Sequence, residues 1–260
     1  MPNDDDAMFA NILNSLRIRD KNVPFSDEID CMLQSRENLP DEPETALHVF
    51  GTNTKVEKYN HELVSKKCER VFDLSACDLE KSSNGKLKIL SNHRKGNSSA
   101  LLDVLKIGLE DRGMLMRNLD VDHDLVNGVF GTVKRFLENN GKITGIYVKS
   151  EHDPEGRGPA VPIAANLPPN AVLVTRVEEP LQTQRNSNIS NLVRRQIPLK
   201  LGWAATIHKT QGMSITQLVY DMSDTFAAGM GYVALNQVVS LQGLYLKGYS
   251  PNVICRDERI

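Results

Sequence analysis

The sequence of 260 residues predicts an α/β protein with a mostly parallel sheet and a middle part rich in short strands. In the first and last thirds, short apolar runs alternate with stretches of helical periodicity, which is typical of parallel strand and helix units. In the middle, two strand-like runs flank an Asn-Gly turn, and six of the 12 prolines fall between residues 154 and 180. We therefore expect residues 1–124 and 194–260 to form one α/β domain, interrupted by a small β unit at residues 125–193.

The composition is that of an ordinary globular protein, with 40% hydrophobic and 25% charged residues. Lysine and arginine number 31 against 33 aspartate and glutamate residues, so any contact with nucleic acid has to come from a local patch. No apolar run approaches the ~18 residues that a membrane helix needs, and the acidic residues 1–6 argue against a secretory or transit peptide. We expect an intracellular protein without membrane contact.

The four cysteines predict free thiols and no metal site, because they form no CxxC pair and have no histidine at ligand spacing. These cysteines are Cys31, Cys68, Cys77 and Cys255. The patterns HExxH and GxSxG are also absent, which leaves a metalloprotease or a serine hydrolase without support.

Two helices are expected before the first strand. The first follows three aspartates, which favour a helix N-terminus, and its apolar residues Met8, Ile12, Leu13 and Leu16 recur at helical spacing. The second begins near Ser26 and turns its apolar residues 29, 32 and 33 inward.

A strand, a tight turn and a helix follow over residues 46–64. The apolar run 46–50 predicts a buried strand, and Thr54 and Glu57 have the spacing of a capping box at the start of a helix. The turn between them contains Thr52 and Asn53. Because such a turn points backbone N–H groups beyond the strand end, it predicts a phosphate contact.

The middle and last thirds continue the α/β pattern around the β unit. Polar residues 77–99 predict a surface insertion, and the two strand-like runs about the turn at 139–141 predict a hairpin. The further elements that we expect are a helix over 101–109, strands at 113–117, 129–136, 142–149, 197–201, 219–221 and 244–246, and helices over 202–211 and 231–239.

Residues 201–215, Leu-Gly-Trp-Ala-Ala-Thr-Ile-His-Lys-Thr-Gln-Gly-Met-Ser-Ile, resemble motif V of the superfamily 1B DNA helicases of the Pif (petite integration frequency) type and their RecD-like relatives. Further similarity lies at 115–119 with 125–128, at 196–199, at 231–244 where the family has motif VI, and at 249–251. The segment with Thr52, Asn53, Val56 and Asn60 also resembles a strand-to-helix contact segment of the family. The resemblance covers nearly the whole chain from residue 9 to 253.

The resemblance implies a fold and a function. The fold is the second RecA-like domain of a helicase, interrupted by a small SH3-like β-barrel insertion, and the function is that of the C-terminal half of a 5′-to-3′ ATP-dependent DNA helicase. ATP and Mg²⁺ would be the cofactors, and single-stranded or structured DNA and a missing N-terminal RecA-like domain the partners. The family acts in the nucleus and the mitochondrion, in DNA repair, recombination and telomere maintenance.

The motif V segment also has the chemistry that a sliding phosphate contact needs, since it combines a positive charge, hydrogen-bond donors and an adjacent glycine. We expect DNA contact from His208, Lys209 and Thr52, and a link between the DNA and the nucleotide from Gln211 and Gly212. Asn53, Thr206 and Thr210 complete the set of residues expected at the DNA.

Ordinary structural roles compete with these assignments. Thr52 and Asn53 are equally well explained as a helix cap, and a His-Lys pair outside this motif is usually a solvated helix face. We expect Trp203, the only tryptophan, in the core rather than as a base-stacking platform. The pairs 194–195 and 66–67 are expected to be solvated charge, with a wider DNA-facing patch as the alternative.

The sequence lacks most of the motifs with which the family binds and hydrolyses ATP. The phosphate-cradling pattern GxxxxGK[ST] and an acidic Mg²⁺-binding motif are absent. Gln237 occupies the position where motif VI of the family carries an arginine, and losing such an arginine costs ~10³-fold or more in rate. We expect the chain alone to be inactive, and a Gln237→Arg change joined to an intact first domain to raise turnover.

Two other functions remain open. The chain could be a catalytically inactive, truncated helicase relic that binds DNA, or a protein-interaction module that has kept the fold without its ligands. Salt-dependent binding of single-stranded DNA would separate the first from the second.

Overall fold

The computed structural model describes residues 4–18, 23–67, 70–82, 84, 86–90, 97–151, 167–168, 171–183, 192–227 and 229–254. The chain divides into two compact units, unit 1 from residues 1–62 with 203–260 and unit 2 from residues 63–202. The β-rich unit is thus wider than the 125–193 that we expected for the insertion. The strands responsible lie between residues 71 and 115, where the sequence had predicted only one.

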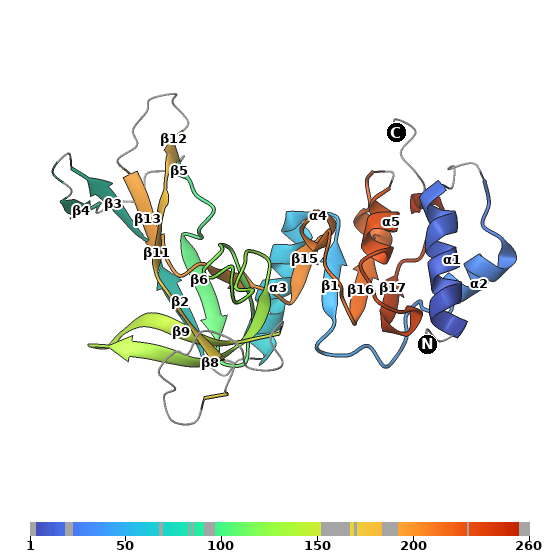
Figure 1. Ribbon diagram of the computed structural model, residues 1–260, viewed down its shortest axis with the longest axis horizontal. Helices are drawn as coiled ribbons and strands as arrows, with labels where there is room; N and C mark the ends of the chain where they lie inside the picture. Colours follow the sequence, from blue (N-terminus) through green and yellow to red (C-terminus); the bar gives the residue numbers. More distant parts are fainter. Residues whose placement is uncertain are drawn as a thin grey trace. The chain divides into compact units, whose positions relative to one another are not determined.

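Unit 1 is built on the parallel sheet that the sequence predicts. The strand order is β15-β1-β16-β17, and all three neighbouring pairs are parallel (Figure 1). Nearly every residue of these strands is buried, as is usual for a parallel sheet with both faces covered. The strands are β1 (Leu47–Phe50), β15 (Ala204–Thr206), β16 (Leu218–Asp221) and β17 (Leu244–Lys247).

The helices of this unit begin close to where the caps predict. Ser26 caps the second helix by accepting a hydrogen bond from Ile29 N–H at 3.4 Å. The first helix buries Phe9, Ile12 and Leu16, whereas Met8, one of the apolar residues at helical spacing, is 39% exposed. The helices are α1 (Asp4–Ile18), α2 (Asp27–Gln34), α3 (Asn53–Lys67), α4 (Ile207–Thr210) and α5 (Met230–Leu235), with 3-10 helices η1 (Met222–Asp224), η2 (Leu241–Gly243) and η3 (Pro251–Val253).

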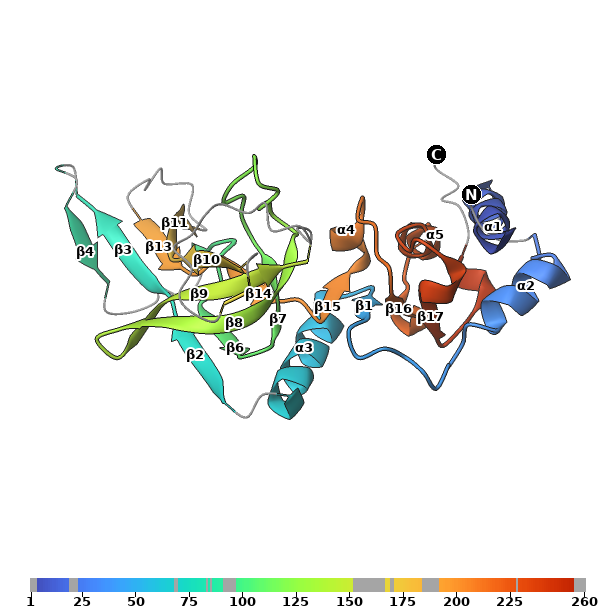
Figure 2. The ribbon, with the colours of Figure 1, turned by 60° about the horizontal axis from the view of Figure 1, so that its bottom comes forward.

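Unit 2 consists of antiparallel strands. The largest sheet has the order β10-β9-β8-β7-β14, and its long pair β8 and β9 is the expected hairpin (Figure 2). Asn140 and Gly141 at the turn have φ values of 49° and 73°, which fits the turn type expected for Asn-Gly. The strands are β2 (Val71–Ser75), β3 (Cys77–Lys81), β4 (Leu87–Ile89), β5 (Asn97–Ser98), β6 (Val104–Gly108), β7 (Arg112–Leu115), β8 (Phe130–Asn139), β9 (Lys142–Ser150), β10 (Ala171–Thr175), β11 (Val177–Pro180), β12 (Gln182–Thr183), β13 (Leu192–Gln196) and β14 (Leu199–Leu201).

Three sequence predictions were wrong. The expected helix over 101–109 is strand β6, which pairs with β2 and buries Leu105 and Ile107 while Val104 faces solvent. The expected surface insertion 77–99 contains β3, which pairs with β13. The expected helix over 202–211 begins as strand β15 and becomes helical only at Ile207. In each case strand pairing outweighed a local preference that the sequence had suggested.

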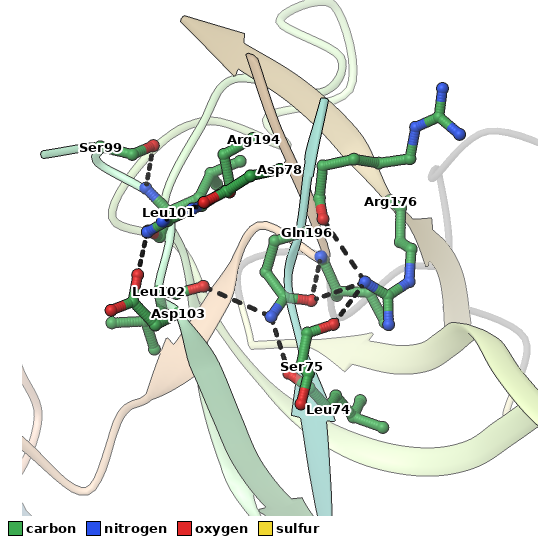
Figure 3. A network of polar contacts seen from close by, with 12 residues as sticks. Leu74, Ser75, Asp78, Ser99, Leu101, Leu102, Asp103, Arg176, Arg194 and Gln196 are labelled. Carbon is green, nitrogen blue, oxygen red and sulfur yellow. Dashed lines mark hydrogen bonds and ion pairs between the residues drawn. The ribbon is translucent and has the colours of Figure 1, made fainter. Parts of the chain in front are cut away.

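A second sheet of unit 2, ordered β11-β13-β3-β4, is held by a buried polar network (Figure 3). Arg194 donates two hydrogen bonds to the Asp78 carboxylate, at 2.8 and 3.0 Å, and also pairs with Asp103. Gln196 Nε2 donates to Leu74 O at 2.7 Å (Figure 3). Arg194 is only 4% exposed, so the expectation of solvated charge or of a DNA-facing patch was wrong for this residue, whereas the Arg195 side chain is 40% exposed and paired with Glu178.

The described residues also bear on the cysteines, on Trp203, and on membrane and metal contact. Cys31 and Cys77 are free thiols, as predicted, whereas Cys68 and Cys255 lie outside the described residues. Trp203 is 7% exposed and belongs to the core, as predicted. Within the described ranges, the helices are too short or too polar to cross a membrane. Among the same residues, histidine, cysteine and carboxylate side chains do not gather in threes as a metal site would need.

Candidate DNA-facing site

The turn between β1 and α3 binds an anion, and that anion is a side chain of the same unit. Gly51 N–H donates to Asp224 Oδ1 at 3.0 Å, and Thr52 N–H and Oγ1–H both donate to Asp224 Oδ2 at 3.1 Å. The sequence predicted N–H groups aimed at an anion here and named a phosphate as that anion. The geometry of the prediction is confirmed, but the group that occupies the turn is the carboxylate of η1.

The approach of η1 to this turn requires a glycine and brings a cation with it. A Cβ atom on Gly51 would lie 2.4 Å from Asp224 O, so no side chain fits at this position. Lys55 donates to Ser223 Oγ at 2.7 Å and lies 3.6 Å from Asp221 and 3.8 Å from Asp224. Burial raises the pKa of Asp221, but hydrogen bonds from Ser223 and the charge of Lys55 outweigh it and lower that pKa overall.

Asn60 connects α3 to the motif V-like segment. Its Nδ2 donates to Ala204 O at 3.3 Å, and its Oδ1 accepts from Ala204 N–H at 2.9 Å. Because β15 is an edge strand of the parallel sheet, this side chain satisfies backbone groups that would otherwise have no strand partner. Asn60 is 5% exposed, so its amide is held in place. It therefore fixes the strand that leads into α4 relative to the helix that begins after Thr52.

The motif V-like segment presents two of its predicted residues to solvent. His208 and Lys209 on α4 are exposed, and Lys209 makes no ion pair with any residue in the described part of the chain. Thr206 is the N-cap residue of α4 and is 8% exposed. Thr210 is fully buried and its hydroxyl donates to Ile207 O at 2.8 Å. The Thr206 side chain makes no capping hydrogen bond, and both threonines expose little surface, whereas His208 and Lys209 are exposed.

The residues predicted to couple DNA to the nucleotide meet Gln237. Gln211 and Gly212 form the exposed turn after α4, and Gly212 has a φ of 83°, which favours glycine. Gly212 N–H donates to Gln237 Oε1 at 2.8 Å, and Gln237 Nε2 donates to Val233 O at 2.8 Å. Gln237 is 6% exposed, and both ends of its side-chain amide are hydrogen-bonded within the protein.

The residues of the chain do not fit ATP and Mg²⁺ as a complete site. The pattern that cradles phosphates is absent from the sequence, and the acidic pair Asp221 and Asp224 is bound to Lys55, Ser223 and the turn after β1. Sequence reasoning missed both Asp224 and the role of Asn60. The sequence does place Asp224 three residues beyond the end of the strand predicted at 219–221, but nothing in it pairs that residue with the turn at 51–52.

The sequence of this chain is similar to those of DNA helicases. No protein-family model matches the chain. The rat "ATP-dependent DNA helicase PIF1" is 34% identical over 161 residues, which cover 60% of this chain and 21% of the relative. The Pif1 helicase of Bdellovibrio bacteriovorus is 24% identical over 255 residues, 98% of this chain and 50% of the relative. The chain thus spans about half the length of this bacterial relative and a fifth of the mammalian one.

Solved structures match the fold over nearly the whole chain. The crystal structure of Pif1 helicase from Candida albicans superimposes with a TM-score of 0.70 at 22% identity, covering 97% of this chain and 56% of that one. Bacteroides Pif1 bound to single-stranded DNA gives 0.68 at 20% identity, covering 97% and 51%. The fold is therefore that of a RecA-like helicase domain with a parallel sheet. The sequence relatives are more specific: the chain is similar in sequence to proteins named Pif1 DNA helicases, the family that the motif V resemblance predicted.

Proposed function

We propose that this chain is the DNA-gripping C-terminal half of a 5′-to-3′ ATP-dependent DNA helicase. In this proposal unit 1 is the second RecA-like domain, and it holds single-stranded DNA through His208 and Lys209, with further contacts from Thr52 in the turn after β1 and from Asn53 at the start of α3. One observation carries the proposal. The exposed His208 and Lys209 directly follow the parallel strand β15. Asn60 hydrogen-bonds this strand to α3, so the positions of both side chains on α4 are supported by the sheet.

The proposal also covers the cofactors, the DNA and the compartment in which the chain acts. ATP and Mg²⁺ would be bound largely by a first RecA-like domain, because the residues here supply no phosphate loop. Unit 2 would contain the SH3-like insertion, and the DNA could be single-stranded or structured, as in the forked DNA of one Pif1 structure. Work in the nucleus or the mitochondrion, in repair, recombination and telomere maintenance, completes the proposal. Alone, the chain would bind DNA without unwinding it.

The test is binding of the chain to a fluorescent single-stranded oligonucleotide at several salt concentrations. We expect the affinity to fall with salt, because cationic contacts release counterions from phosphates. The double variant His208→Ala/Lys209→Ala should bind at least about tenfold more weakly and show a salt slope smaller by about 0.7 per lost phosphate contact. Arg17→Ala serves as the control, because it removes one exposed positive charge from the end of α1 in the same unit.

Three outcomes would count against the proposal. They are no binding of the unchanged chain, binding that ignores salt, and equal losses in the double variant and in Arg17→Ala. Absent or salt-independent binding would favour the second candidate function, a protein-interaction module on a helicase fold. The observation behind that alternative is Gln237, whose amide is committed to the protein where the family has a catalytic arginine.

A further inference from the structure

Gln237 joins two segments that are far apart in the sequence. From its place just after α5, its side chain reaches the turn after α4, where Oε1 accepts the N–H of Gly212 at 2.8 Å. The other end of the same amide donates to Val233 O at 2.8 Å within α5. Gln237 is 6% exposed, whereas Gly212 lies at the surface, so the two hydrogen bonds are partly shielded from water and together orient the amide.

The backbone of Gln237 supports the same connection. Ile215 N–H donates to Gln237 O at 2.8 Å, and Val239 N–H donates to Ile215 O at 2.9 Å. These two bonds hold residue 215 beside residues 237–239, but they leave the turn at Gly212 without a backbone partner from this segment. The side-chain amide adds the contact at Gly212, three residues after Lys209.

We propose that Gln237 is a positioning residue for DNA binding: it fixes the turn at Gly212 and thereby holds α4, with His208 and Lys209, in the orientation that grips a phosphate. This inference rests on the proposed DNA-binding function. The helix α4 has only four residues, too few to keep its direction by its own hydrogen bonds. Its N-terminal side is fixed through Asn60 and β15, so its C-terminal side needs a second anchor.

An arginine could not do this at position 237. A guanidinium group has five donors and no acceptor, whereas Gly212 offers an N–H that needs an acceptor. The position can therefore carry either a cation directed at a nucleotide phosphate or an acceptor directed at Gly212. In this chain position 237 carries the acceptor. The glutamine therefore holds the turn at Gly212, a role that the arginine of the family could not have.

The experiment compares three substitutions at this position in the full chain. Gln237→Met keeps the length and removes the acceptor, Gln237→Arg replaces the acceptor by donors, and Gln237→Glu keeps an acceptor for Gly212 N–H. The measurements are the hydrogen-exchange rate of the Gly212 amide and the salt slope of binding to a single-stranded oligonucleotide. A thermal melt of each variant confirms folding.

We expect Met and Arg to speed exchange at Gly212 by about tenfold or more, the loss of one partly shielded hydrogen bond. They should also lower the salt slope by about 0.7, the contribution of one phosphate contact on a single strand, which is about fivefold in affinity between 1 M and 0.1 M salt. The Gln237→Glu variant should keep both the slow exchange of the Gly212 amide and the salt slope of DNA binding. A purely structural role would lower the melting temperature and leave the slope unchanged.

The outcomes separate this inference from the proposed function. If the unchanged chain binds DNA and the Met and Arg variants keep its slope, the positioning role is overturned while the DNA-binding function stands. If the Gln237→Met and Gln237→Arg variants fail to fold, the Gln237→Glu variant decides. Rapid exchange of the Gly212 amide or a reduced salt slope in a folded Gln237→Glu variant contradicts the proposed role of the hydrogen bond to Gly212. If the unchanged chain binds no DNA, the proposed function fails first and this inference fails with it, whatever the exchange rate shows.

Discussion

Asp224 puts a negative charge where the turn after β1 could otherwise meet a phosphate. Its carboxylate takes both N–H groups of Gly51 and Thr52 and the Thr52 hydroxyl. Thr52 can donate to a DNA phosphate only if this carboxylate gives up at least one of these bonds. If DNA binds as proposed, Asp224 competes with it for Thr52, and its charge repels a nearby phosphate.

Neutralising this side chain should strengthen DNA binding. We expect Asp224→Asn to raise the affinity for single-stranded DNA by about threefold to tenfold at low salt, with a smaller gain at high salt because the repulsion is screened. The same change should lower the free energy of unfolding by about 1 kcal/mol, because a charge-assisted contact with a helix N-terminus is lost. Fluorescence anisotropy and urea unfolding measure the two effects.

Asp27→Asn is the matched control for charge, since Asp27 lies exposed in the first turn of α2 in the same unit. An equal gain in affinity in this variant would show that net charge alone explains the effect. An unchanged affinity in Asp224→Asn would mean that Thr52 takes no part in DNA binding.

His48 makes unit 1 sensitive to acid. It is 6% exposed, its ring stacks on Tyr59 with centroids 4.2 Å apart, and its Nε2 lies 3.1 Å from Glu42. Burial lowers the pKa of His48 to about 4, with Lys247 acting in the same direction and with Glu42 and Asp221 opposing them. The native state therefore holds this histidine neutral at pH values where the unfolded chain protonates it.

The sign of the pH dependence follows from these two states. Below the ordinary pKa of about 6.5 the unfolded state binds a proton that the native state binds only near pH 4, so the free energy of unfolding falls between pH 6.5 and 4. We expect a decrease of up to about 3 kcal/mol from this residue and none above pH 7. Urea unfolding at several pH values measures it, and a His48→Gln variant should lose this part of the slope. An equally steep slope in His48→Gln would assign the acid sensitivity to other groups.

At the scale of elements, the edge strand β15 depends on one side chain of α3. Asn60 satisfies both the N–H and the C=O of Ala204, and removing it leaves two buried backbone groups without partners. We expect Asn60→Ala to cost roughly 2 kcal/mol or more in unit 1 and Asn60→Asp, which keeps only the acceptor, to cost a similar amount. Lys58→Ala, on the exposed side of the same helix, should change stability by less than about 0.5 kcal/mol. Equal effects at positions 58 and 60 in urea unfolding would contradict the role of Asn60.

The elements also show what could be predicted from the sequence. The strand at 46–50, the turn after it and the hairpin about Asn140 were predictable because each rests on a local pattern, namely an apolar run, a capping sequence or an Asn-Gly turn. Strands β6 and β15 were not, because their residues adopt strand geometry only through partners 29 or more residues away in the sequence. His208 and Lys209 were found through the motif, whereas Asp224 and the contact of Gln237 depend on tertiary pairing that no spacing shows.

At the scale of the whole molecule, positive and negative charges nearly balance. The net charge is −2, and cations such as Arg112, Lys134 and Arg194 are bound to carboxylates. A DNA-binding surface in such a chain cannot come from excess positive charge and has to come from cations that the fold leaves unpaired. Lys209 meets this condition among the described residues, which is why the proposed grip centres on α4.

Each unit has its own hydrophobic core, so each should respond to its own substitutions. In unit 2, Asp78 and Arg194 have side chains only 2% and 5% exposed, and removing the carboxylate leaves a buried guanidinium with one acidic partner, Asp103. We expect Asp78→Ala to cost about 3–5 kcal/mol, whereas Asp73→Ala, which breaks the exposed pair with Lys106, should cost at most about 1 kcal/mol.

Scanning calorimetry can test whether the units unfold separately. Two transitions are expected, since the described residues form hydrophobic clusters within each unit. Asp78→Ala should lower only the transition of unit 2, and Asn60→Ala only that of unit 1. A single transition lowered by both substitutions would mean that the units unfold together, so that damage in the β-rich unit would also weaken the proposed DNA grip on α4.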